Sequence, residues 1–239
     1  MSAKARFWWL SVATLLGMTL TASLGRWQLQ RATEKETLQA RIEARAQLPV
    51  LDALSLQGED KVQALLYRKV EARGRWLGEH TVFLDNRPMN GRAGFYVLTP
   101  LQLEGSVSAV LVQRGWVPRD FADRALVPRI QTPDGPVQLR GHIAPAPSKL
   151  YDLGGSDRGA IRQNLDVAQF RAETGLALAS VSIQQSGEAS DGLLRDWPKV
   201  NTGVEKHYGY AFQWFGLSAL IAVLYVWFQL APRFKRRQA

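Results

Sequence analysis

Two uncharged apolar runs, one near each end of the chain, constrain this protein more than any other feature. The first, FWWLSVATLLGMTLTASL, occupies residues 7–24, and the second occupies residues 208–231. As helices rising about 1.5 Å per residue, they would measure roughly 27 Å and 36 Å, enough to cross the hydrocarbon layer of a membrane. We therefore expect an integral membrane protein with two transmembrane helices, and residues 25–207 between them must lie on one side of the membrane.

The first run has a second interpretation. Lys4 and Arg6 precede it, and TAS around Ala22 resembles a cleavage site, as in a secretory signal peptide. The run is longer than the usual signal core, however, and it continues into helix-favouring sequence. We therefore favour an uncleaved anchor.

The distribution of charge predicts the topology. The net charge is +9, and six of the basic residues lie at the two ends: Lys4, Arg6, Arg233, Lys235, Arg236 and Arg237. Basic residues next to membrane spans favour the cytoplasmic side. We therefore expect residues 1–6 and 232–239 in the cytoplasm and the central domain in the periplasm. A bacterial inner membrane fits best, because no long transit segment precedes the first run. No basic stripe with interleaved aromatic residues indicates nucleic acid as a partner.

The central region predicts a helical stalk followed by a small β domain. Residues 25–47 contain helix-favouring residues without an internal proline. Strand-like segments bounded by turn residues then fill about 62–185. They are residues 67–72, 80–85, 95–103, 107–116, 137–143 and 179–184. The turn at EGS predicts a hairpin, and Asp166 and Gly175 delimit a short helix. The fold class is therefore two transmembrane α-helices flanking a mainly antiparallel β domain of the α+β class.

Enzyme signatures are nearly absent from the sequence. The chain has no cysteine, which excludes disulfides, thiolate metal sites and cysteine nucleophiles. Its three histidines, His80, His142 and His207, have no metal-ligand spacing. Arg87 and Arg92 are candidates to bind carboxylates, or they belong to an exposed hairpin loop. Arg114 either pairs within the sheet or reaches a partner. We expect a protein that is not an enzyme, although a catalytic cluster assembled only in three dimensions stays an open alternative.

His207 stands out because it lies directly before the second apolar run. On a helix it shares a face with Tyr210 and Trp214, and Gly209 and Gly216 would let a flat ligand approach closely. A neutral imidazole backed by aromatic rings is able to ligate haem iron. The alternative is an amphipathic residue that anchors the helix at the membrane interface.

Several segments together resemble the Surfeit locus protein 1 family, whose members help assemble cytochrome c oxidase. The resemblance covers almost the whole chain and is carried by five segments: LGRWQLQRATEKETL (24–38), LYRKVEARGRW (66–76), GFYVLTPL (94–101), VLVQRGWVPRD (110–120) and KHYGYAFQWFGLSA (206–219). Gly74, Arg114 and Gly115 match family positions. The asparagine that often precedes the histidine in this family is replaced here by Glu205 and Lys206.

The resemblance implies an assembly factor that promotes haem a insertion into subunit I of cytochrome c oxidase, or that stabilises this subunit. It also implies transient binding of haem a, with His207 as an iron ligand and with Tyr210 and Trp214 beside the porphyrin. Subunit I and other assembly factors would be the partners. A haem-free membrane scaffold that binds oxidase subunits is the alternative function.

Overall fold

The computed structural model describes residues 2–56, 62–120, 122–123, 126–147, 159–198 and 203–233. The expected tail at 232–239 therefore falls largely outside the described residues. The chain forms two compact units: a pair of helices made from its two ends, and a β-rich unit within Ile42–Lys199.

The helix pair consists of α1 (Ala3–Ala46) and α4 (Val204–Tyr225), and α4 continues as a π-helical segment, η4 (Val226–Leu230). Both helices are long and apolar enough to cross a membrane. The first run and the expected stalk thus form one unbroken helix. The predicted helix at 25–47 is confirmed, because α1 ends within one residue of the expected position.

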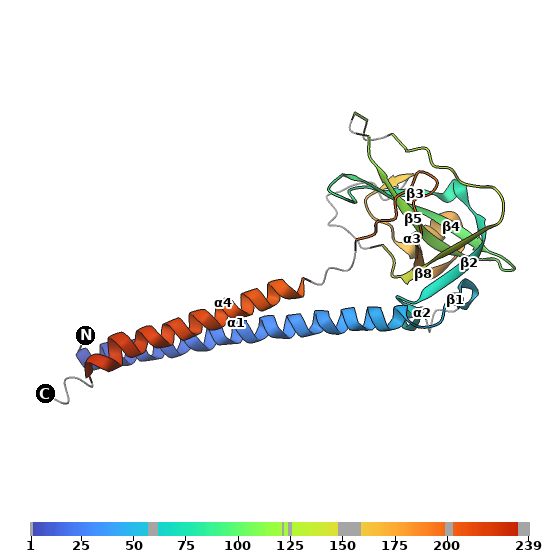
Figure 1. Ribbon diagram of the computed structural model, residues 1–239. Coiled ribbons are helices and arrows are strands. Elements are labelled where there is room, and N and C mark those ends of the chain that lie inside the picture. The colour runs from blue at the N-terminus through green and yellow to red at the C-terminus, as the bar shows by residue number, and fades with distance from the viewer. Residues whose placement is uncertain are drawn as a thin grey trace. The chain divides into compact units, whose positions relative to one another are not determined.

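The β-rich unit contains eight strands in one sheet. They are β1 (Leu51–Asp52), β2 (Lys69–Trp76), β3 (Val82–Leu84), β4 (Gly94–Leu103), β5 (Ser108–Pro118), β6 (Val137–Ala144), β7 (Ile161–Arg162) and β8 (Ala177–Gln185). Among the described residues of this unit, short helical elements accompany the strands: η1 (Ala53–Leu56), α2 (Val62–Leu65), η3 (Gly78–His80) and α3 (Val167–Thr174). Figure 1 shows the strands wrapped around a common interior.

Five of these strands close into a barrel. Along the sheet, β2 pairs with β6, β6 with β8, β8 with β5 and β5 with β4, and an additional pairing of β4 with β2 completes the ring. Closure pairs the two outer strands of this ring with each other, so the sheet ends in the two-residue strands β1 and β7 rather than in a long open edge. Gly74 makes it possible, because a Cβ atom at this position would overlap the carbonyl oxygen of Gln102 on β4.

The barrel interior is apolar and receives alternate side chains from all five strands, as the two-residue period of a strand requires. Its buried strand residues are Val70, Ala72, Leu101, Leu103, Val110, Val112, Leu139, Ile143, Val181 and Ile183. On the outside, α3 covers a second cluster that includes Leu84, Leu111 and Phe170. The Asp166 side chain accepts hydrogen bonds from the first turn of α3, and Gly175 ends the helix in the left-handed conformation, which confirms the predicted boundaries.

Each of the six predicted strand segments overlaps a strand of the sheet, but the two-residue strands β1 and β7 were not predicted. The predicted hairpin is β4–β5, with a register shift between Val97 and Leu98. The segment at 80–85 is shorter than predicted, because His80 belongs to η3. Antiparallel pairings outnumber parallel ones by five to three, but β5 and β8, both inside the barrel, run parallel.

Candidate functional site

His207 lies in the first turn of α4. The helix begins after Gly203, whose φ of 57° places it in the left-handed region that glycine adopts without a Cβ penalty. The carbonyl oxygen of Gly203 accepts a hydrogen bond of 3.2 Å from the Lys206 amide. A single glycine therefore sets where α4 starts and where its histidine points.

The two helices run antiparallel and contact each other along a regular seam (Figure 1). On α4 one row of at least partly buried residues is spaced alternately four and three apart: His207, Ala211, Trp214, Ser218, Ile221 and Tyr225. The matching residues of α1 follow the same spacing: Phe7, Ser11, Thr14, Met18, Thr21, Gly25, Gln28, Ala32 and Lys35. This 3.5-residue period is typical of helices that pack in a left-handed pair.

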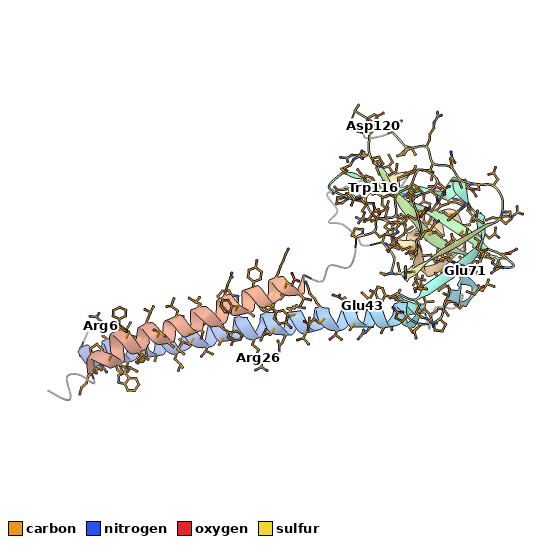
Figure 2. All side chains as sticks on the ribbon, in the orientation of Figure 1. Arg6, Arg26, Glu43, Glu71, Trp116 and Asp120 are labelled. Carbon is orange, nitrogen blue, oxygen red and sulfur yellow. The ribbon has the colours of Figure 1, made fainter. Side chains whose placement is uncertain are left out.

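Hydrogen bonds occur at both ends of the seam. Near one end, the hydroxyls of Ser11 and Tyr225 lie 2.5 Å apart, and the Arg233 guanidinium lies over the Phe7 ring at 3.4 Å. In Figure 2, Arg6 lies at this same end of the pair. Near the other end, His207 and Tyr208 both bind α1. Phe7 and Arg233 therefore lie at one end of the helix pair, and His207 lies at the other.

The imidazole of His207 is held by Gln28. Its Nδ1 lies 2.7 Å from Oε1 of Gln28, and the hydroxyl of the next residue, Tyr208, donates to Oε1 of Glu36 at 2.9 Å. Within the part of the chain that the structure describes, Nε2 of His207 makes no hydrogen bond. The half-buried ring is therefore fixed on one side and keeps its second nitrogen available.

The aromatic residues expected beside His207 take two different positions. Trp214 lies on the seam and is partly buried, whereas Tyr210 is 52% exposed on the outer side of α4. Gly209 and Gly216 have no atom within 4 Å of the position that a Cβ would occupy. The expectation that these glycines let a flat ligand approach His207 is not met, because both lie about half a turn round α4 from the histidine.

The donor set fits haem better than a chelated metal ion. No group of three or more His, Asp or Glu side chains that could hold a metal occurs among the described residues. Haem iron, by contrast, is held by four porphyrin nitrogens and needs only one or two axial ligands from protein. One imidazole with a bare nitrogen satisfies that requirement.

The other two histidines belong to the β-rich unit. Nε2 of His80 lies 3.6 Å from Oε1 of Glu79, and these two sequence neighbours form a partly exposed pair. His142 is bonded to the Ser186 hydroxyl at 3.1 Å, and burial, followed by the charge of Lys69, lowers its pKa. Neither has the neighbours of a ligand site.

Of the three arginines singled out in the sequence, Arg92 is exposed in the loop before β4, whereas Arg87 and Arg114 serve the fold. Arg87 is 4% exposed and donates to the carbonyl oxygen of Gln163 at 3.1 Å, so it is not accessible to a carboxylate ligand. Arg114 is fully buried on β5, at the position where the β4–β5 register shifts.

The contacts of Arg114 explain how a buried cation is tolerated. It donates to Thr132 Oγ1 and the Gln131 carbonyl oxygen, both at 2.8 Å, and its guanidinium lies 4.6 Å from the centre of the Trp76 ring. Burial lowers its pKa, and Asp191 at 3.4 Å opposes that shift. The open alternatives for Arg114 therefore resolve to a contact within the β domain.

Gln28 and Glu36 are the residues of this site that sequence reasoning missed. Both lie on α1, more than 170 positions from His207, so local spacing around the histidine gives no hint of them. The available signal was the small and polar stripe along the first helix, with Thr14, Thr21, Gly25 and Gln28 spaced seven, four and three apart.

The architecture defines a class of protein in which a small closed β-barrel is inserted, in sequence, between two apolar helices long enough to span a membrane. The chain belongs to the SURF1 family, whose family model matches residues 15–219.

Individual relatives agree with this assignment. A SURF1-like protein of Rickettsia felis is 28% identical over 90% of this chain and 95% of its own length. Surfeit locus protein 1 of Arabidopsis thaliana is 29% identical over 49% of this chain and 36% of its own length. The cytochrome oxidase assembly protein SHY1 of Saccharomyces cerevisiae is 30% identical over 39% of this chain and 24% of its own length.

Proposed function

We propose that this protein is a two-span membrane protein of the bacterial inner membrane that acts in the assembly of cytochrome c oxidase, without being an enzyme. The observation that carries the proposal is the family match over residues 15–219, which includes most of both apolar helices and the whole barrel. The name of the yeast relative, a cytochrome oxidase assembly protein, supplies the process.

The placement of aromatic side chains supports two membrane spans. Exposed Trp9 and Trp27 lie 18 residues apart on α1, and exposed Tyr210 and Trp227 lie 17 residues apart across α4 and η4. Both separations correspond to about 26 Å, close to the thickness of the hydrocarbon layer, and aromatic residues are enriched at both of its interfaces. His207 then lies at one interface.

The basic residues suggest on which side of the membrane His207 lies. At the end of the helix pair away from His207, Lys4, Arg6 and Arg233 lie beyond Trp9 and Trp227 in the sequence. Basic residues in this position favour the cytoplasm for both termini. His207 and the barrel domain then lie on the periplasmic side. The contacts of α1 with α4 along the first apolar run favour a retained anchor over a cleaved signal peptide.

Transient binding of haem a at His207 is the more specific part of the proposal. Haem is the cargo here, and Nε2 of His207 would be an axial ligand of its iron. Tyr210 would lie beside the porphyrin, while Trp214 supports the helix from the seam side. A single protein ligand suits release of the cargo to subunit I of the oxidase, and the barrel domain is the part available to bind subunit I or other assembly factors.

One observation favours the alternative, a haem-free scaffold that binds oxidase subunits. Nδ1 of His207 already connects α4 to α1 through Gln28. In a scaffold, this hydrogen bond would be the entire role of the histidine, which would then serve only to join the two helices.

The test compares His207→Asn with His207→Ala in protein purified in detergent from cells that make haem a. Asparagine places an amide N–H close to the position of Nδ1, so it keeps a donor for Gln28 but lacks Nε2. The haem proposal expects loss of co-purifying haem a in both variants, with no loss in the matched control His80→Ala.

Oxidase assembly is measured in the same strains, as the amount of subunit I that co-purifies and the amount of active oxidase in membranes. Normal assembly in His207→Asn, together with a wild-type pigment content in every variant, would remove the haem proposal and leave the scaffold. Normal assembly in a strain that lacks the whole protein would contradict both.

A further inference from the structure

The hydrogen bond between His207 and Gln28 has a direction that follows from its atoms. The Gln28 atom 2.7 Å from Nδ1 is Oε1, a carbonyl oxygen that only accepts hydrogen bonds. With the amide in this orientation Nδ1 donates. Because a neutral imidazole carries one N–H, Nε2 is then left with a bare lone pair. The reversed amide would instead donate to Nδ1 and place the imidazole proton on Nε2.

We infer that Gln28 is a positioning residue that selects the tautomer and orientation in which His207 presents Nε2 to haem iron. The inference rests on the haem-binding function proposed above. Iron-ligating histidines generally donate their second ring N–H to an acceptor, which fixes the ring and raises the basicity of the ligating nitrogen. Gln28 would supply that acceptor from the other helix.

The packing around Gln28 makes this contact a built feature of the helix pair. Gly25, one turn away on the α1 seam, lies against the face of Phe215: a Cβ here would be 2.9 Å from a ring carbon. The missing side chain lets the helices approach closely in this region. The bond from Tyr208 to Glu36 then fixes the residue directly after His207. The imidazole is thus held by its own hydrogen bond and by the register of the helix that carries it.

The choice of an amide over a carboxylate has a chemical consequence. A carboxylate accepting the Nδ1 proton would raise the basicity of Nε2 more strongly, because a charged acceptor forms the stronger hydrogen bond. The neutral amide of Gln28 orients the ring while strengthening the iron bond less. That property suits a protein that must release its cargo.

Gln30 provides a matched control. It lies two residues from Gln28 on the same helix, but it is exposed and off the seam. The substitutions to compare are Gln28→Leu, which removes the acceptor, Gln28→Glu, which keeps one, and Gln30→Leu, which repeats the same change where His207 is not contacted.

The first measurement is nitrogen NMR of the full-length protein in detergent, without haem and with labelled histidine. The chain has only three histidines, so a His207→Ala sample assigns the signal. We expect the proton on Nδ1 in the wild type, in Gln28→Glu and in Gln30→Leu, and a shift towards the Nε2–H tautomer in Gln28→Leu. A proton on Nε2 in the wild type would overturn the inference, whatever the protein binds.

The second measurement titrates the same proteins with haem a and follows the Soret band. We expect Gln28→Leu to bind about 10-fold or more weakly, as is usual when the partner of a ligating histidine is lost, and Gln30→Leu to bind as the wild type does. We expect Gln28→Glu to bind at least as tightly as the wild type.

The variants distinguish failure of the positioning role of Gln28 from failure of haem binding at His207. If His207→Ala weakens binding but Gln28→Leu does not, Gln28 is not a positioning residue and the haem proposal stands. If His207→Ala binds as the wild type does, the haem proposal fails, and Gln28 then has no ligand to position.

Discussion

The barrel domain buries its largest side chains, whereas the helix pair buries only small ones. Trp116, Arg114, Phe95 and Phe170 are among the fully buried residues of the β-rich unit, and Figure 2 shows Trp116 within it. Among the described residues of the helix pair, the buried ones are Thr21, Gly25, Ala32 and Ala211. The barrel is therefore stabilised by removing apolar surface from water, and the helix pair by close backbone approach and a few hydrogen bonds.

The difference indicates where the molecule can adapt. A closed barrel with a packed interior resists deformation, because each strand is bonded on both sides. Helices in a membrane gain little from apolar contact with each other, since lipid is equally apolar. A site that must take up and release a ligand is better placed on the helix pair, which is where His207 lies.

The largest effect is expected in the barrel, on replacing Arg114 with methionine. The change removes the donor that Arg114 provides to Thr132 Oγ1 and to the Gln131 carbonyl oxygen, and it leaves Asp191 with Ser190 and Arg195 as its remaining partners. Removing one member of a buried charged network costs about 3 kcal/mol or more. Urea unfolding of the full-length protein in detergent, followed by tryptophan fluorescence, measures the change. Arg75→Met, on an exposed part of β2, is the control; equal midpoints for the two variants would show that the buried network contributes nothing.

A smaller loss is expected from Gly74→Ala, where β2 closes against β4. The added methyl group must displace the carbonyl oxygen of Gln102, and overpacking of this kind costs about 1–3 kcal/mol. Hydrogen exchange should report it locally, because the amides of Leu77 and Glu104 donate across this junction, each at 2.9 Å. Faster exchange at these two amides is expected in Gly74→Ala but not in Gly135→Ala, where a Cβ meets no atom within 4 Å. Unchanged protection would mean that the barrel does not depend on a tight closure here.

The same contrast explains which parts of the fold were predictable. The helix cap at Asp166, the hairpin at β4–β5 and the end of α1 depend on residues close in sequence, and the sequence predicts all three correctly. Barrel closure depends on Gly74 meeting Gln102, and the parallel pair β5–β8 joins residues about 70 positions apart. Periodicity within one strand carries no information about either partner.

The residues of the candidate site also differ in whether the sequence alone reveals them. His207 is identifiable because an imidazole directly before an apolar run is conspicuous. Gln28 is not, because its role depends on the antiparallel register of two helices at opposite ends of the chain. Arginine burial was missed for another reason: the residue type is usually exposed. Only the assembled fold provides the carbonyl oxygen, the hydroxyl and the aromatic ring that contact the guanidinium of Arg114.

The smallest effect is expected in the helix pair, at the bond between Ser11 and Tyr225. Ser11 also donates to the Phe7 carbonyl oxygen at 2.9 Å, so Tyr225 donates to Ser11. Hydrogen bonds between membrane helices contribute about 0.6 kcal/mol on average, because the separated helices find other partners. We therefore expect Ser11→Ala and Tyr225→Phe each to lose about that amount, and the double variant to lose no more than one of them.

Fluorescence energy transfer between dyes on two introduced cysteines, followed through an SDS titration, measures this loss, and the absence of native cysteine keeps the labelling specific. Thr19→Val, on an exposed position of α1, removes a hydroxyl that faces away from the seam and should change nothing. A loss of several kcal/mol from Tyr225→Phe would show that the helix pair is a rigid unit, as the barrel is. It would then be necessary to explain how a site built on so rigid a pair releases its ligand.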